Sequence, residues 1–85
     1  MTEFTFTVKD SSGIHARPAG LLVKEATKYK SDIKIKHNGK EADAKRIFSV
    51  MSLSAKCGDT LKITISGEDE THAKECFEDF LKKNL

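Results

Sequence analysis

Residues 13–19 read Gly-Ile-His-Ala-Arg-Pro-Ala and bring a histidine and an arginine close to a predicted helix start. Pro18 favours the first turn of a helix, because proline has no N–H to lose there. A helix start presents unpaired N–H groups and partial positive charge, which together bind anions. Arg17 adds a planar fork of donors that matches phosphate oxygens. His15 is therefore a candidate nucleophile beside a phosphate pocket, whose positive charge favours the neutral imidazole.

The remaining histidines and the cysteines offer weaker chemistry. His37 adjoins the Asn-Gly pair at 38–39, and His72 falls in the first turn of a predicted helix. Neither has an arginine and a helix start together, so we expect both to be solvated surface residues. Cys57 and Cys76 lack the close spacing of a zinc or redox motif, and we expect both to be reduced. We expect no metal site and no cofactor.

The composition fits one compact domain spanning residues 1–85. Apolar residues make up 38% and charged residues 33% of the chain, as in folded globular proteins. The net charge of +2, from 15 basic and 13 acidic residues, is too balanced for a general polyanion binder. No apolar run approaches the ~18 residues of a membrane span, and the N-terminus has no signal-peptide pattern. We expect a cytoplasmic protein without membrane insertion.

Apolar periodicity predicts the elements of the first half. Alternation predicts a strand over residues 4–8, and helical spacing predicts a helix from about Ala16–Lys30. Residues 33–37 alternate again, and the Asn-Gly pair at 38–39 favours a tight turn into a third strand near residues 40–44.

The second half predicts a short helix over residues 47–53, a fourth strand over residues 61–66 and a last helix that Asp69 caps. The apolar stripe of that helix is Ala73, Cys76, Phe77, Phe80 and Leu81. The order is βαββαβα. Both sets of apolar residues are buried if three helices cover one face of a four-stranded antiparallel sheet, which is an open-faced sandwich of the α/β (α+β) class.

Two segments, residues 13–19 and 42–53, look like the signature regions of a known family. The chain resembles the HPr family, the histidine-containing phosphocarriers of the bacterial phosphoenolpyruvate-dependent sugar phosphotransferase system. The resemblance extends from the first strand to the last helix and includes length and element order. It implies a protein that is not an enzyme but a protein substrate shared by two enzymes.

The resemblance also implies the roles of the site residues. His15 would accept a phosphoryl group on its δ1 nitrogen from enzyme I and pass it to IIA components of sugar permeases. Arg17 would pair with that group, and the backbone N–H groups of Ala16 and Arg17 would complete the cradle. The protein supplies positioning and charge stabilisation for an in-line transfer.

The short helix at 47–53 would lie beside this loop and help to form a docking surface for successive partners. Apolar side chains with a basic rim suit a transient interface. We expect a monomer, because a relay protein exposes one site to each partner in turn. The predicted partner-binding residues are Gly20, Leu21, Lys24, Ile47, Phe48, Met51 and Lys56. Taken singly, Ile47, Phe48 and Met51 also fit a place in the core, and the two lysines also fit an ordinary solvated face.

Arg46 departs from one branch of the family, in which a kinase phosphorylates a serine at this position. Arginine cannot accept a phosphoryl ester, so the regulatory half of the family's function is in doubt. Ser49 and Ser52 are nearby hydroxyls, but a kinase reads position. Arginine is also a poorer N-cap than serine, and a cation is unfavourable at a helix start.

Two other functions fit parts of the pattern. A relative in a nitrogen-type regulatory relay would keep the fold and His15 but serve another recipient. An RNA-binding α/β module has a similar sheet, but it stacks bases on aromatic residues of its central strands. Residues 34–37 and 62–65 lack those aromatics. We therefore expect no nucleic-acid partner.

Overall fold

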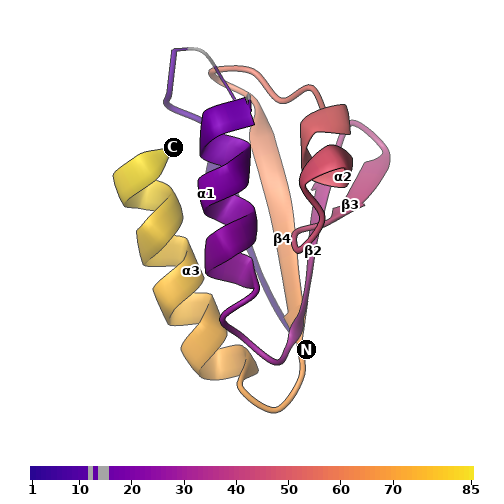
Figure 1. Ribbon diagram of the computed structural model, residues 1–85, viewed down its shortest axis with the longest axis vertical. Helices are drawn as coiled ribbons and strands as arrows, with labels where there is room; N and C mark the ends of the chain where they lie inside the picture. The colour runs from indigo at the N-terminus through magenta and orange to yellow at the C-terminus, as the bar shows by residue number, and fades with distance from the viewer. Residues whose placement is uncertain (12, 14–15) are drawn as a thin grey trace.

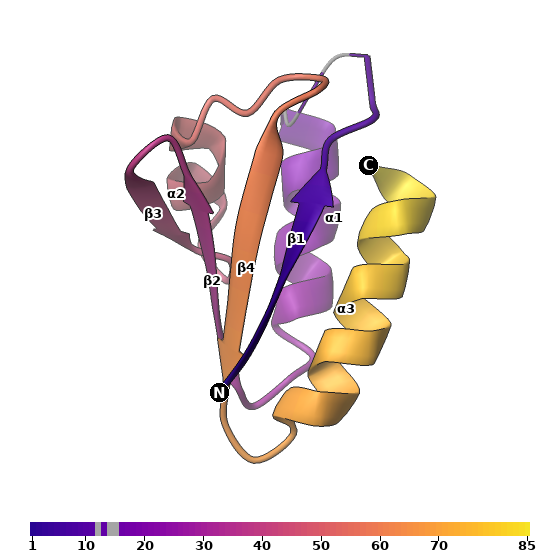
Figure 2. The same cartoon turned by 180° about the vertical axis from the view of Figure 1, so that it is seen from behind.

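The computed structural model describes residues 1–11, 13 and 16–85, and its four strands form one antiparallel sheet in the order β1-β4-β2-β3. Helices lie on one side of this sheet, in front of it in Figure 1 and behind it in Figure 2. The predicted βαββαβα open-faced sandwich is confirmed. The elements are β1 (Thr2–Thr7), α1 (Ala16–Ala26), β2 (Asp32–His37), β3 (Lys40–Asp43), α2 (Ile47–Ser52), β4 (Thr60–Ser66) and α3 (Glu70–Asn84).

The core forms where the alternating strand residues meet the helix stripes. In β4, Leu61 and Ile63 are buried, whereas Lys62 between them is exposed. Leu22 of α1 and Phe77 of α3 are fully buried in the same core. The alternating apolar residues of the strands and the apolar stripes of the helices are therefore buried in one layer between sheet and helices, as the sequence predicts.

The face of the sheet away from the helices is polar. Lys62 of β4 lies 3.5 Å from Glu3, and Lys36 of β2 lies 3.7 Å from Glu41. Phe4 and Phe6 of β1 belong instead to the core side. The open face thus offers paired charges and hydroxyls.

Helix α1 ends at Ala26, so the prediction that it runs to about Lys30 is wrong by one turn. The N–H groups of Lys28 and Tyr29 donate to the carbonyls of Glu25 and Ala26, which is the i−3 pattern of a tightened turn. Tyr29 is nevertheless buried, and its hydroxyl donates to Glu25 at 2.6 Å. The apolar spacing that led to the longer predicted helix includes Tyr29, which is buried as expected but from the turn after α1.

Asp69 precedes α3 at the N-cap position, but its side chain makes no capping hydrogen bond, so the predicted capping role is wrong. The carboxylate accepts the N–H groups of Lys30 and Ser31, both at 2.9 Å, and the hydroxyl of Ser31. These bonds, that of the Ser31 hydroxyl first, lower the pKa of Asp69 to about 2. Asp69 thus ties the α1–β2 turn to the start of α3.

His37 is buried, with 7% of its surface exposed, so the prediction of a solvated residue is wrong. Its ring lies on the core side of β2, where Nδ1 contacts the carbonyl oxygen of Leu53 at 3.0 Å and Nε2 contacts Asp59 at 2.9 Å. The sequence places His37 beside the β2–β3 turn but does not reveal that the loop between α2 and β4, distant in the chain, folds over its ring. His72, by contrast, is exposed as predicted.

Candidate phosphoryl-transfer site

The first turn of α1 holds one exposed basic residue, followed by two buried residues. Arg17 is exposed, whereas Pro18 and Ala19 are buried against the core. The first turn holds no acidic residue, so nothing in it neutralises the positive end of the helix. His15, together with Ser12 and Ile14, lies outside the described residues, so the roles predicted for His15, Arg17 and the Ala16 backbone remain predictions.

Gly13 packs its backbone directly on the loop between α2 and β4. A β-carbon on Gly13 would lie 2.5 Å from the carbonyl oxygen of Ala55 and 2.9 Å from Cα of Lys56. Its φ of +68° also lies in the left-handed region that favours glycine. Lys56, a predicted partner-binding residue, is therefore next to the segment that enters α1, although the sequence gives no signal of this contact.

Two of the predicted docking residues, Gly20 of α1 and Ile47 of α2, lie where the two helices pack together. Figures 1 and 2 show α2 level with the N-terminal half of α1. Phe48 is 83% exposed, Leu21 47% and Met51 36%; together with Met1 they are the large apolar side chains exposed in the described part of the chain. Ile47 is partly buried, and a β-carbon on Gly20 would lie 3.8 Å from its Cδ1 atom.

Leu21, Phe48 and Met51 are called the apolar patch below, and three exposed residues on or next to the same elements are basic. Lys24 and Lys56 are exposed, as is Arg46 at the N-cap of α2. The Arg46 side chain makes no capping bond, and its Nε atom lies 3.8 Å from Asp43. The first turn of α2 holds no acidic residue. These elements thus expose both apolar and basic side chains, a combination that suits transient contact with an acidic partner.

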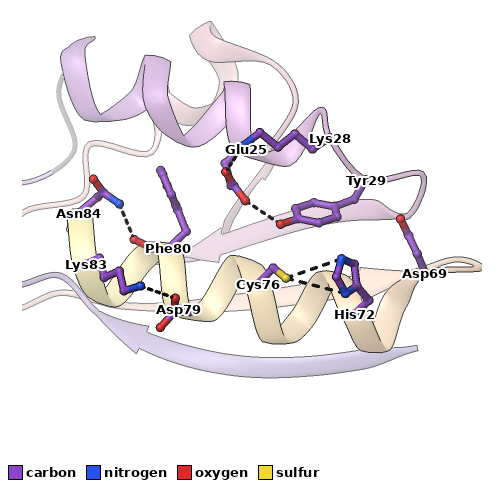
Figure 3. Close-up of a pocket in the computed structure, with 10 residues that line it drawn as sticks. All are labelled: Glu25, Lys28, Tyr29, Asp69, His72, Cys76, Asp79, Phe80, Lys83 and Asn84. Atoms are coloured by element: carbon purple, nitrogen blue, oxygen red, sulfur yellow. Dashed lines mark hydrogen bonds and ion pairs between the residues drawn. The ribbon is translucent and has the colours of Figure 1, made fainter.

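A hollow of about 550 Å³ lies between the C-terminal part of α1 and α3 (Figure 3). Its polar groups bond with one another: Tyr29 donates to Glu25, and Cys76 lies 3.7 Å from Nε2 of His72. Burial and the Glu25 carboxylate raise the pKa of Tyr29. The rings of Tyr29 and His72 also meet edge to face, with their centroids 6.0 Å apart, and this contact joins the turn after α1 to α3.

Within the described residues, no cluster of three or more His, Cys, Asp or Glu side chains has the arrangement of a metal site. Both cysteines are free, Cys57 exposed and Cys76 half-buried. The described helices include none long and apolar enough to span a membrane.

Comparison with known proteins assigns this chain and its fold to one class. Residues 2–83 match the family described as "PTS HPr component phosphorylation site". HPr-C-His from Thermoanaerobacter tengcongensis is 36% identical, with a TM-score of 0.93 over 99% of this chain and 94% of that one. HPr from Bacillus anthracis is 37% identical, with a TM-score of 0.84 over 89% and 90% of the two chains.

Crh from Bacillus subtilis, a protein described by its role in catabolite repression, is also similar. It is 33% identical, with a TM-score of 0.78 over 100% of this chain and 98% of that one, and it is described as a swapped dimer. The family match thus defines a phosphocarrier, a protein substrate rather than an enzyme. The chain belongs to the HPr family.

Proposed function

We propose that the protein carries phosphoryl groups in sugar uptake, accepting them on His15 from enzyme I and passing them to IIA components of sugar permeases. The observation that carries this proposal is the family match, which spans the segment where His15 precedes an exposed Arg17 in the first turn of α1. A positive helix end and a guanidinium stabilise a bound phosphoryl group. The reaction then requires only that donor and acceptor imidazoles meet in line.

The exposed patch supports the use of two partners in succession. A side chain such as Phe48, exposed to 83%, contributes little to the core. The exposed Lys24 and Lys56, in α1 and in the loop after α2, can attract an acidic surface. Met51 adapts to different partners because its side chain is flexible and polarisable. We propose that Gly20, Leu21, Lys24, Ile47, Phe48, Met51 and Lys56 form this docking surface and that a cytoplasmic monomer presents it.

The test is a two-step transfer. The protein is incubated with phosphoenolpyruvate and enzyme I, and its intact mass is measured before and after addition of a IIA domain. We expect one acid-labile phosphoryl group, which disappears when IIA is added. Absence of the first mass gain contradicts the phosphocarrier assignment, and failure to transfer to IIA contradicts the role in sugar uptake.

A regulatory role is the second candidate, favoured by the similarity to Crh. It fits less well because Arg46 stands where one branch of the family has a phosphorylated serine. The same incubation distinguishes the two, since a purely regulatory relative would not pass phosphoryl groups to IIA.

A further inference from the structure

The ring of His37 bridges two parts of the loop between α2 and β4. Nδ1 lies 3.0 Å from the carbonyl oxygen of Leu53, and Nε2 lies 2.9 Å from Oδ2 of Asp59. A carbonyl oxygen can only accept, and an ionised carboxylate can only accept. Both ring nitrogens therefore face acceptors, an arrangement that a ring carrying two N–H groups satisfies.

Asp59 is the second member of this bridge. Its Oδ2 atom also accepts the N–H of Lys56 at 2.9 Å. That backbone bond, followed by the bond to His37, lowers the pKa of Asp59. The carboxylate is thus ionised near neutral pH, and His37 and Asp59 close the loop from both ends.

The closed loop in turn holds the chain that leads to α1. Val8 donates to the carbonyl of Asp59 at 2.9 Å and accepts from Gly58 at 2.8 Å. The thiol of Cys57 lies 3.6 Å from the carbonyl of Lys9. Gly13 lies against Ala55 and Lys56, as described above. Every one of these contacts comes from the segment that His37 and Asp59 fix.

We propose that His37, as an imidazolium bound to Leu53 and Asp59, is a positioning residue that holds the 53–59 loop against Gly13 and so sets the entry to the phosphoryl-transfer site. Loss of the ring proton leaves one nitrogen lone pair facing an acceptor, which loosens the loop. The effect on transfer rests on the proposed function. The bridge from His37 to Leu53 and Asp59, called the His37 clamp below, is a property of the described residues.

The charged neighbours of His37 keep their charge through the range in which histidine titrates. Lysine side chains remain cations and ionised carboxylates remain anions between about pH 5 and pH 8. His37 lines two shallow hollows on the surface. The charged residues that line them with it are Lys36, Lys40, Glu41, Lys56, Asp59 and Lys62.

The test follows backbone amides by NMR during a pH titration of the full chain. We expect the amide shifts of Gly13, Ala55 and Lys56 to follow the titration of the His37 ring in the wild type. In His37→Gln, which places a neutral donor near the position of Nε2, that common titration should vanish. His72→Gln removes an exposed histidine from α3 and should leave it intact.

Transfer rates from enzyme I give the second readout. We expect His37→Gln to be slower by roughly fivefold, the loss of about one hydrogen bond, with a flattened pH profile. His37→Asn, which keeps a donor near Nδ1, separates the Leu53 contact from the Asp59 contact. Amides that ignore the His37 titration overturn the clamp. Amides that follow it while His37→Gln transfers at the wild-type rate overturn its role in transfer, and a wild type that accepts no phosphoryl group overturns only the proposed function.

Discussion

The backbone of Gly13 lies so close to Ala55 that a β-carbon on residue 13 would sit 2.5 Å from the Ala55 carbonyl oxygen. This contact joins the segment before α1 to the α2–β4 loop, two parts of the chain that the sequence keeps far apart. Residue 13 must be glycine for two reasons: a β-carbon has no room there, and the φ of +68° lies in the left-handed region that favours glycine.

Gly13→Ala should therefore be costly. A left-handed conformation costs about 1–2 kcal/mol with a β-carbon, and overpacking adds about 1–3 kcal/mol. The control is Gly39→Ala, where φ is +80° but no atom lies within 4 Å of the added carbon. We expect urea unfolding to show a clearly larger loss of stability for Gly13→Ala. Equal losses would show that the close approach contributes nothing.

Phe48 and Val50 are near neighbours on α2 with opposite environments, exposed to 83% and 0%. Phe48→Ala should change the free energy of unfolding by less than about 0.5 kcal/mol, whereas Val50→Ala should cost about 1–2.5 kcal/mol. If Phe48 is a docking anchor, its removal should slow transfer from enzyme I about tenfold. Stopped-flow transfer and urea unfolding measure the two effects, and unchanged transfer in Phe48→Ala would remove this residue from the docking surface.

Asp69 makes the stability sensitive to acid. Its pKa is lowered to about 2, so its hydrogen bonds stabilise the fold above the unfolded pKa of about 3.9 and are lost as the pH falls toward 2. In Asp69→Asn the free energy of unfolding should fall less steeply over this interval than in the wild type. Asp79→Asn, which loses an ion pair with Lys83, is the control and should keep the wild-type slope. A wild-type slope in Asp69→Asn would contradict the role of the carboxylate.

Arg46 should act through charge at the encounter with enzyme I. It is 78% exposed, and rim charges change association rates through screened attraction. We expect Arg46→Glu to slow transfer at low salt, Arg46→Ser to be intermediate, and the differences to shrink as salt rises. Arg46→Ser should also stabilise α2, because serine caps a helix better than arginine. Equal rates for all three proteins at low salt would place residue 46 outside the encounter.

The sequence predicts the sheet and helices well because each buries one side of a regular pattern. Residues 61–65 alternate without interruption, and their burial follows the same alternation. Tertiary contacts override local preference where the prediction is wrong. Asp69 is a good cap residue, but the turn at Lys30 and Ser31 supplies three donors to its carboxylate.

The predicted site depends on resemblance more than on pattern. The helix start and Arg17 can be predicted from Pro18 and the apolar spacing. The spacing alone fits Phe48 equally well in the core, and only the family resemblance predicts the exposure that the structure shows. His37 and Asp59 carry no such signal, since 22 residues separate them and only the strand order brings them together. A histidine beside a turn is typical of a surface, and only the fold covers it.

Phosphorylation by enzyme I and phosphoenolpyruvate, compared by intact mass in wild type, His15→Ala and His72→Gln, tests the central proposal most directly. The expected result is one acid-labile phosphoryl group on the wild type and on His72→Gln, and none on a His15→Ala variant whose NMR spectrum shows a folded chain. A phosphoryl group retained by folded His15→Ala, or absent from the wild type, would contradict the assignment of His15 as the carrier.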